Sequence, residues 1–171
     1  MFTVIAHSPQ CATWGGRGNF TFRHDVAKRC IAQKCMWDRG VGVVVEAPVS
    51  ISATGQAPLR MDLVIGSLWV DVTVTRDETR RFKEKHALYG EAAVMAGATL
   101  KVLAFSDKGN ILPESVSLAR RLAKMCGLPM NEMMGEAMTA IAAHSSRARC
   151  KAVNHCMAAW HTGCLVMPTA P

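Results

Sequence analysis

Two aspartates, Asp62 and Asp71, stand symmetrically about the dipeptide Gly66-Ser67, each at the far end of an apolar run. A two-residue turn at this dipeptide would join the runs as a β-hairpin. The pairs that follow are Ile65 with Leu68, Val64 with Trp69, Leu63 with Val70, and Asp62 with Asp71. Directly opposed carboxylates in apolar surroundings repel each other. Because Mg²⁺ takes one or two carboxylates together with water and phosphate oxygens, the pair indicates a divalent metal site.

A second reading of the aspartates stays open. Short strands often end in an acid, and Asp62 and Asp71 could instead bond nearby amides or an arginine such as Arg60. The register also rests on the turn type, and a slip of one residue would move the acids to different faces of the sheet.

A basic segment follows the hairpin. Lys85 and Tyr89 lie one helical turn apart and share a helix face, and three further cations crowd the same segment: Arg80, Arg81 and Lys83. A lysine beside a metal-bound phosphate orients the attacking water or stabilises the charge of the transition state. Lys85 therefore suits phosphodiester hydrolysis, whereas the alternative interpretation of this segment is a solvated basic helix face.

The elements that would position these residues alternate in type along the chain. Hydrophobic spacing, β-branched runs and glycine stops predict helices at Arg23–Arg39, Arg76–Ala96, Glu114–Cys126 and Asn131–Trp160, and strands at Val41–Val49, Met61–Ile65, Leu68–Thr75 and Thr99–Phe105. Met1–Phe22 is expected to be irregular. A strand that follows a helix in this order requires a crossover connection. The expected fold class is α/β, a small mixed β-sheet flanked by helices in the order α-β-β-β-α-β and followed by C-terminal helices.

The composition limits the classes of protein to which this chain could belong. The chain has 171 residues, of which 50% are hydrophobic, enough for one globular domain. Its seven cysteines are an odd number with no secretory leader before them, so we expect free thiols, a reducing intracellular compartment and no membrane partner. The formal net charge of +7 favours a polyanionic partner such as nucleic acid, although the few aromatic residues offer little surface for stacking single-stranded bases.

Several short motifs, taken in order, resemble one known family. The motifs are Arg23-His24-Asp25, the segment Gly42 to Glu46, Arg60-Met61-Asp62, the strand Val70-Asp71-Val72-Thr73-Val74, Lys85 four residues before Tyr89, and Thr99–Phe105 with Pro113 and Glu114 after it. This series resembles the restriction-like endonuclease domain, of the PD-(D/E)xK superfamily, in the polyproteins of site-specific non-LTR retrotransposons. The resemblance covers most of the chain.

The resemblance implies a restriction-endonuclease-like core and a set of site residues. It implies Mg²⁺ or Mn²⁺ held by Asp62 and Asp71 with Glu46, and catalysis by these aspartates with Lys85 and Tyr89. Contacts to nucleic acid would come from six residues: Arg60, Arg80, Arg81, Lys83, Arg23 and His24. The implied partners are DNA and an upstream reverse transcriptase region of the same polyprotein, and the implied location is the nucleus.

The sequence also departs from the family pattern. Met61 replaces the usual proline, Leu88 replaces a second lysine, and the superfamily's lysine two positions after the second acid is Thr73. His7 and Cys11 resemble half of the zinc knuckle that precedes this domain, so residues 1–22 would be a remnant of that region, 23–128 the nuclease core and 129–171 a helical extension. Since a structural zinc site needs four ligands, Zn²⁺ is not expected in this fragment.

Two functions from different classes follow. The first is a metal-dependent DNA endonuclease that nicks or cleaves target DNA for retrotransposon integration. The alternative is a catalytically degenerate nucleic-acid-binding module from such a polyprotein, which the departures and the net charge favour.

Overall fold

The computed structural model describes residues 16–39, 41–49 and 59–161. Its elements are α2 (Gly16–Arg39), β1 (Val44–Pro48), β2 (Arg60–Ile65), β3 (Leu68–Val74), α3 (Glu78–Met95), β4 (Thr99–Phe105), a 3₁₀ turn η1 (Pro113–Ser115), α4 (Val116–Cys126) and α5 (Met130–His161). The protein is an α/β protein with a small mixed four-stranded sheet flanked by helices, as the sequence predicted at this level.

The strands are ordered β1-β2-β3-β4 in the sheet. β1 pairs with β2 and β2 with β3 in antiparallel fashion, whereas β3 and β4 are parallel because α3 carries the chain across one face between them. Gly66 begins the hairpin turn with a φ of 58°, a left-handed conformation that glycine adopts without a Cβ clash. Three of the predicted hairpin pairs are confirmed: Ile65 with Leu68, Val64 with Trp69 and Leu63 with Val70.

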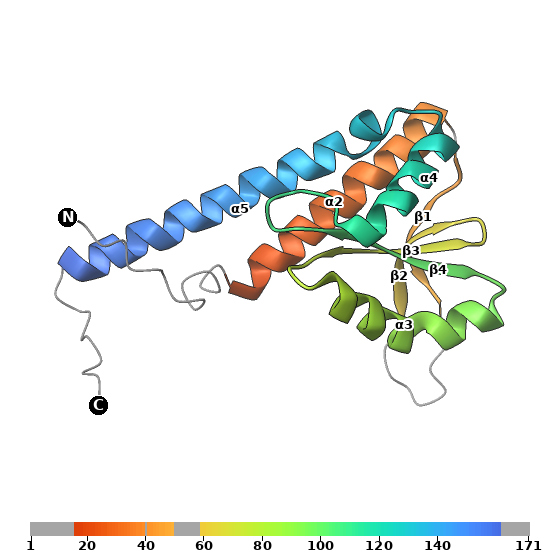
Figure 1. Cartoon of the computed structure of the whole chain (residues 1–171), viewed down its shortest axis with the longest axis horizontal. Coiled ribbons are helices and arrows are strands. Elements are labelled where there is room, and N and C mark those ends of the chain that lie inside the picture. Colours follow the sequence, from red (N-terminus) through yellow and green to blue (C-terminus); the bar gives the residue numbers. More distant parts are fainter. Residues whose placement is uncertain (1–15, 40, 50–58, 162–171) are drawn as a thin grey trace.

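Helices cover both faces of the sheet. α2, α4 and α5 lie on one face and α3 lies on the other (Figure 1). The larger core lies under the three helices and includes Val70, Val72, Leu103 and Phe105 of the sheet. A smaller core under α3 contains Met61, Trp69, Tyr89, Ala93 and Leu100. The sheet therefore separates two apolar cores.

The C-terminal segment belongs partly to the main core. Met133, Met134, Ala137 and Ile141 of α5 are fully buried against α2 and its neighbours. Met133 and Met134 are thus core residues. Further along the same helix pair, Arg23 of α2 donates from Nη1 to Ser145 Oγ of α5 at 2.8 Å.

The structure corrects one predicted boundary. Helix α2 begins at Gly16, so residues 16–22 are helical where Met1–Phe22 was expected to be irregular. Cys30, Cys35, Cys126 and Cys150 are free thiols, in agreement with the expectation for these four cysteines. None of the helices in the described ranges is long and apolar enough to cross a membrane.

Candidate metal and phosphate site

The two aspartates lie where strands β2 and β3 diverge. The β-ladder ends at Leu63 and Val70, so the fourth predicted pair, Asp62 with Asp71, does not form as a ladder pair. Instead the Val72 amide donates to Asp62 Oδ2 at 2.8 Å. A side-chain oxygen thus takes a backbone donor of β3, and regular pairing between the strands stops there.

The side of the sheet to which β2 directs its apolar residues also changes at Asp62. Met61 belongs to the core under α3, whereas Leu63 belongs to the core under the other three helices. Residues two apart in a regular strand lie on the same face, so the strand turns over at Asp62. This irregularity brings the Asp62 carboxylate between the strands, and it is the physical reason that the predicted fourth pair is wrong.

Asp71 is a buried acid with one unsatisfied oxygen. Its side chain is 2% exposed, and Lys85 donates to Oδ1 at 2.7 Å. Oδ2 is buried and has no hydrogen-bond partner among the described residues. Burial raises the pKa of Asp71 to about 6; the Lys85 ammonium acts in the opposite direction, and the nearby charge of Asp62 adds to the rise. An unsatisfied buried carboxylate oxygen costs free energy, which a cation placed against it would offset.

Asp62 also has one occupied and one open oxygen. Its Oδ2 accepts from the Val72 amide and lies 2.9 Å from Nε2 of His24. Oδ1 has no hydrogen-bond partner among the residues that the structure describes. Each aspartate therefore offers one uncommitted oxygen, which is the donor set that a divalent cation bound by two carboxylates requires.

The protein supplies few other metal ligands here. No group of three or more histidines, cysteines or acids within the described ranges is placed to hold a metal ion. A Mg²⁺ ion would therefore take its remaining ligands from water and substrate oxygens, as this ion commonly does. Two carboxylate oxygens are the share of ligands that a protein commonly gives to an ion of this kind, and they do not form a closed cage.

His24 connects Asp62 to a second acid on α2. Its Nδ1 lies 3.1 Å from Asp25 Oδ1, while Nε2 faces Asp62. Carboxylates only accept hydrogen bonds, so both contacts require the doubly protonated imidazolium. Burial lowers the pKa of His24, but the hydrogen bond and charge of Asp62 outweigh it and raise that pKa above the usual 6.5. His24 thus fixes the first aspartate, and its side chain is engaged within the protein where a nucleic-acid contact was implied.

Glu46 was implied as a third metal ligand, but its carboxylate has another partner. It forms an ion pair with Lys28 of α2, whose side chain is 5% exposed and which also lies 3.4 Å from Asp25. Glu46 has a φ of 52°, unusual for a residue with a side chain. In the β1–β2 register it falls opposite Asp62, between the pairs Val45–Leu63 and Ala47–Met61. Its charge therefore stabilises Lys28, and its role as a third metal ligand stays a prediction.

Tyr89 supports the site from the α3 face. Its ring is buried, its hydroxyl donates to the Arg60 carbonyl at 3.0 Å, and Lys85 Nζ lies 5.5 Å from the ring centroid. Burial raises the pKa of the Tyr89 phenol. Tyr89 thus ties α3 to the start of β2 and lies under the lysine, so it is a positioning residue.

Two of the three cations on α3 that the resemblance assigned to phosphate contacts already form ion pairs within the protein. Arg80 and Arg81 bind the two oxygens of Glu84 at 2.7 and 2.8 Å. The paired residues are four and three positions apart, so the helical spacing in the sequence already indicated these ion pairs. Lys83 is exposed and forms no ion pair with the described residues.

Two further implied contacts lie on other elements. Arg23 is buried at 7% exposure against Ser145, so it holds α2 to α5 and is not presented to a nucleic acid. Arg60 is exposed at the start of β2, two residues before Asp62. The remaining predicted ligands, His7 and Cys11, lie outside the described residues.

One residue of the site was missed from the sequence. Lys28 stands one helical turn after His24 on α2, a spacing that places both on one helix face. Its buried position was not visible in the pattern of α2, because the surrounding residues come from β1 and β2.

Comparison with known proteins adds no relative: no model of a known protein family matches the chain, and no curated protein matches it.

Proposed function

We propose that this chain is a metal-dependent DNA endonuclease domain that nicks or cleaves target DNA. The observation that carries the proposal is a pair of carboxylate oxygens without a hydrogen-bond partner in the described part of the chain, Asp62 Oδ1 and the buried Oδ2 of Asp71. Lys85 lies 2.7 Å from the other oxygen of Asp71. Two open carboxylate oxygens and a nearby lysine are what a protein supplies to a metal site for phosphodiester hydrolysis.

Each side chain has a distinct role in the proposal. Asp62 and Asp71 would hold Mg²⁺ or Mn²⁺, which when bound polarises the scissile phosphate and lowers the pKa of a water ligand. Lys85 places an ammonium beside Asp71, where it orients water or offsets the negative charge that develops on the phosphate. Tyr89 sets the direction of this lysine, and His24 fixes Asp62 through Oδ2 so that Oδ1 stays available.

Contacts to DNA would come from Arg60 and Lys83, which are exposed and form no ion pair with the described residues. Such phosphate contacts give affinity without sequence information, so target choice would reside elsewhere. By resemblance we further propose a restriction-endonuclease-like core for the fold, an upstream reverse transcriptase region of the same polyprotein as partner, and action in the nucleus.

One observation favours the alternative, a nucleic-acid-binding module without activity. Both aspartates already face a cationic side chain, Lys85 for Asp71 and the His24 imidazolium for Asp62. Such pairs lower the repulsion between the acids in the absence of metal. In a module of this kind the acids would only hold Lys85 and His24 in place, and metal would bind no more tightly than to any exposed carboxylate.

Titration calorimetry with Mn²⁺ and nicking of supercoiled plasmid together test the proposal. We expect Mn²⁺ binding that Asp71→Asn removes, and plasmid nicking that requires the same ion. Plasmid that stays supercoiled with Mn²⁺ or Mg²⁺, together with unchanged calorimetry in Asp71→Asn, would exclude the endonuclease and leave the binding module.

A further inference from the structure

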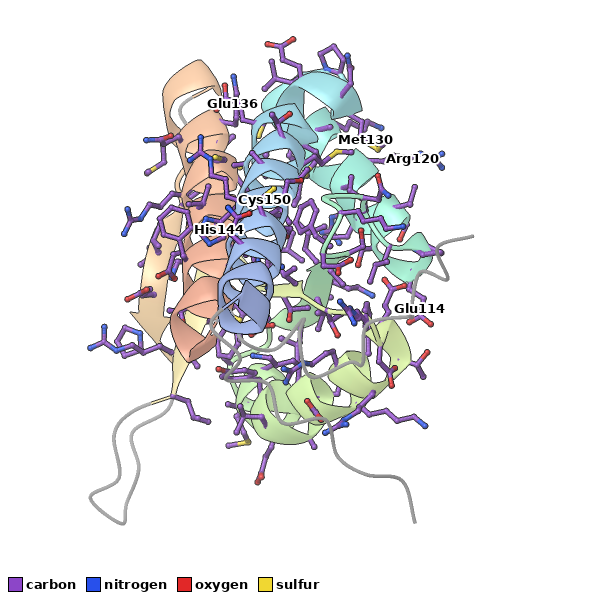
Figure 2. The ribbon with its side chains drawn as sticks, turned by 90° about the vertical axis from the view of Figure 1, so that its left-hand side faces the viewer. Glu114, Arg120, Met130, Glu136, His144 and Cys150 are labelled. Atoms are coloured by element: carbon purple, nitrogen blue, oxygen red, sulfur yellow. The ribbon has the colours of Figure 1, made fainter. Side chains whose placement is uncertain are left out.

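Three of the five exposed residues of α4 are cations, and the other two are Ser117 and Met125. Arg120, Arg121 and Lys124 recur at positions three and four apart, and all three are exposed. We call these three residues the α4 cationic face. The opposite side of the helix is buried, with Leu118, Ala119, Leu122, Ala123 and Cys126 in the main core. Figure 2 shows Arg120 on the outer side of α4, directed away from α5.

These cations have no acidic partners. Arg120, Arg121 and Lys124 form no ion pair or side-chain hydrogen bond with any described residue, and α4 itself contains no acid. The cations of α3 differ, because Glu84 binds both Arg80 and Arg81. Uncompensated like charges on one helix face repel one another, so the α4 cationic face is placed to gain from an anionic ligand.

A fourth cation lies on the same side of the sheet as α4. Lys101 is exposed on the edge strand β4 and has no partner among the described residues. Its strand neighbours Leu103 and Phe105 lie in the core under α4, whereas Leu100 lies under α3. Since alternate residues of a strand share a face, Lys101 is on the α4 side of the sheet.

The residues around this surface indicate which kind of polyanion it would bind. An anionic membrane would require the helix to insert its apolar side, but that side is buried in the protein core. Single-stranded nucleic acid is bound with the help of aromatic stacking, and α4 has no aromatic residue. Closely spaced phosphates on a stiff backbone, as in duplex DNA, need only the fixed row of charges that α4 offers.

We infer that the α4 cationic face, extended by Lys101, is a binding surface for the phosphate backbone of duplex DNA. It lies on the opposite sheet face from α3 and Lys85 and uses none of the residues assigned to the aspartate site (Figure 1). The inference does not depend on cleavage, because an inactive nucleic-acid-binding module would use the same surface.

The test is the salt dependence of binding to a 5′-fluorescein-labelled duplex of random sequence, measured by anisotropy in EDTA. Each neutralised phosphate contributes about 0.9 to the slope of log affinity against log salt. The variant Arg120→Gln/Arg121→Gln/Lys124→Gln should therefore reduce the slope by about 2.7. Equivalently, between 50 and 200 mM salt the parent should lose roughly 40-fold more affinity than the variant.

The matched control is Arg76→Gln/Arg80→Gln/Arg81→Gln, which changes the net charge equally. These arginines already bind Asp107 or Glu84, so we expect a slope change below about 1. Circular dichroism melting verifies that each variant is folded; if the triple variant is not, the single substitution Arg120→Gln should still reduce the slope by about 0.9.

Three results would overturn the inference. They are an unchanged slope in the α4 variant, a slope change in the control as large as in the α4 variant, and the absence of duplex binding by the parent at 50 mM salt. A single-stranded oligonucleotide or anionic vesicles bound more tightly than the duplex would assign the surface to another partner. Since EDTA removes divalent metal, none of these outcomes depends on the aspartate site, whose failure plasmid nicking reports separately.

Discussion

Asp71→Asn removes the charge of a buried acid while it retains the shape of the side chain. Burial holds the pKa of Asp71 at about 6, against an ordinary value of 3.8. Each tenfold change in a protonation constant corresponds to about 1.4 kcal/mol, so this rise is worth about 3 kcal/mol of folding free energy.

The sign follows from the raised pKa. The folded protein binds the Asp71 proton more tightly than the unfolded chain does, so its contribution to stability is present below pH 4 and lost as the pH rises through about 6. Asn does not titrate. We therefore expect the stability of Asp71→Asn, relative to the parent, to increase by about 2.4 kcal/mol between pH 4 and pH 7. Fixed effects of the amide, such as a new unsatisfied N–H, cancel in this difference.

Urea unfolding in EDTA at several pH values measures the change. The control Glu91→Gln removes one charge from the exposed surface of α3 and reports the general effect of charge. A stability difference between Asp71→Asn and the parent that is constant with pH would refute the argument that burial dominates the chemistry of this carboxylate.

The same variants test the metal. Mn²⁺ at one hundred times its dissociation constant would stabilise the parent by about 2.7 kcal/mol. Asp71→Asn lacks an anionic ligand and should gain much less at the same concentration. Equal stabilisation of both proteins, seen as equal shifts of the urea midpoint, would place the ion elsewhere.

Three further variants have expected outcomes. Lys85→Ala should abolish plasmid nicking while Mn²⁺ still raises the urea midpoint, because an ammonium is not a metal ligand; nicking at the parent rate would remove the lysine from the mechanism. His24→Gln should lower stability more at pH 6 than at pH 8, because the raised pKa of His24 makes its contribution complete below 6.5 and lost at higher pH; an equal loss at both values in urea unfolding would contradict this. Gly109→Ala should lower stability by about 2–4 kcal/mol, since Gly109 has a φ of 86° and an added Cβ would overlap the Met138 carbonyl. The control Gly135→Ala has open space and should be neutral or stabilising in the same unfolding assay.

The sequence by itself determined the local structure around the site. A turn dipeptide between two apolar runs specified the hairpin register from Ile65–Leu68 to Leu63–Val70, because side chains alternate and Gly66 accepts a positive φ. Glycine stops and helical spacing likewise specified α4, which ends at Gly127 in the left-handed conformation. These features depend on residues that are close in the chain, so the hydrophobic pattern and the glycine positions were enough to predict them.

Only the tertiary structure decided how the charged groups are partnered. Asp62 Oδ2 contacts both the Val72 amide and His24, and strand β2 changes face at this residue. The alternation of apolar and polar residues in the sequence did not indicate either feature. Glu46 pairs with Lys28 and Arg23 with Ser145 because helices distant in sequence pack beside them. An acid, a base or an arginine has the same letter in the sequence whether it is buried or solvated. Its pKa and its availability to a ligand depend on desolvation and on partners that packing alone brings together.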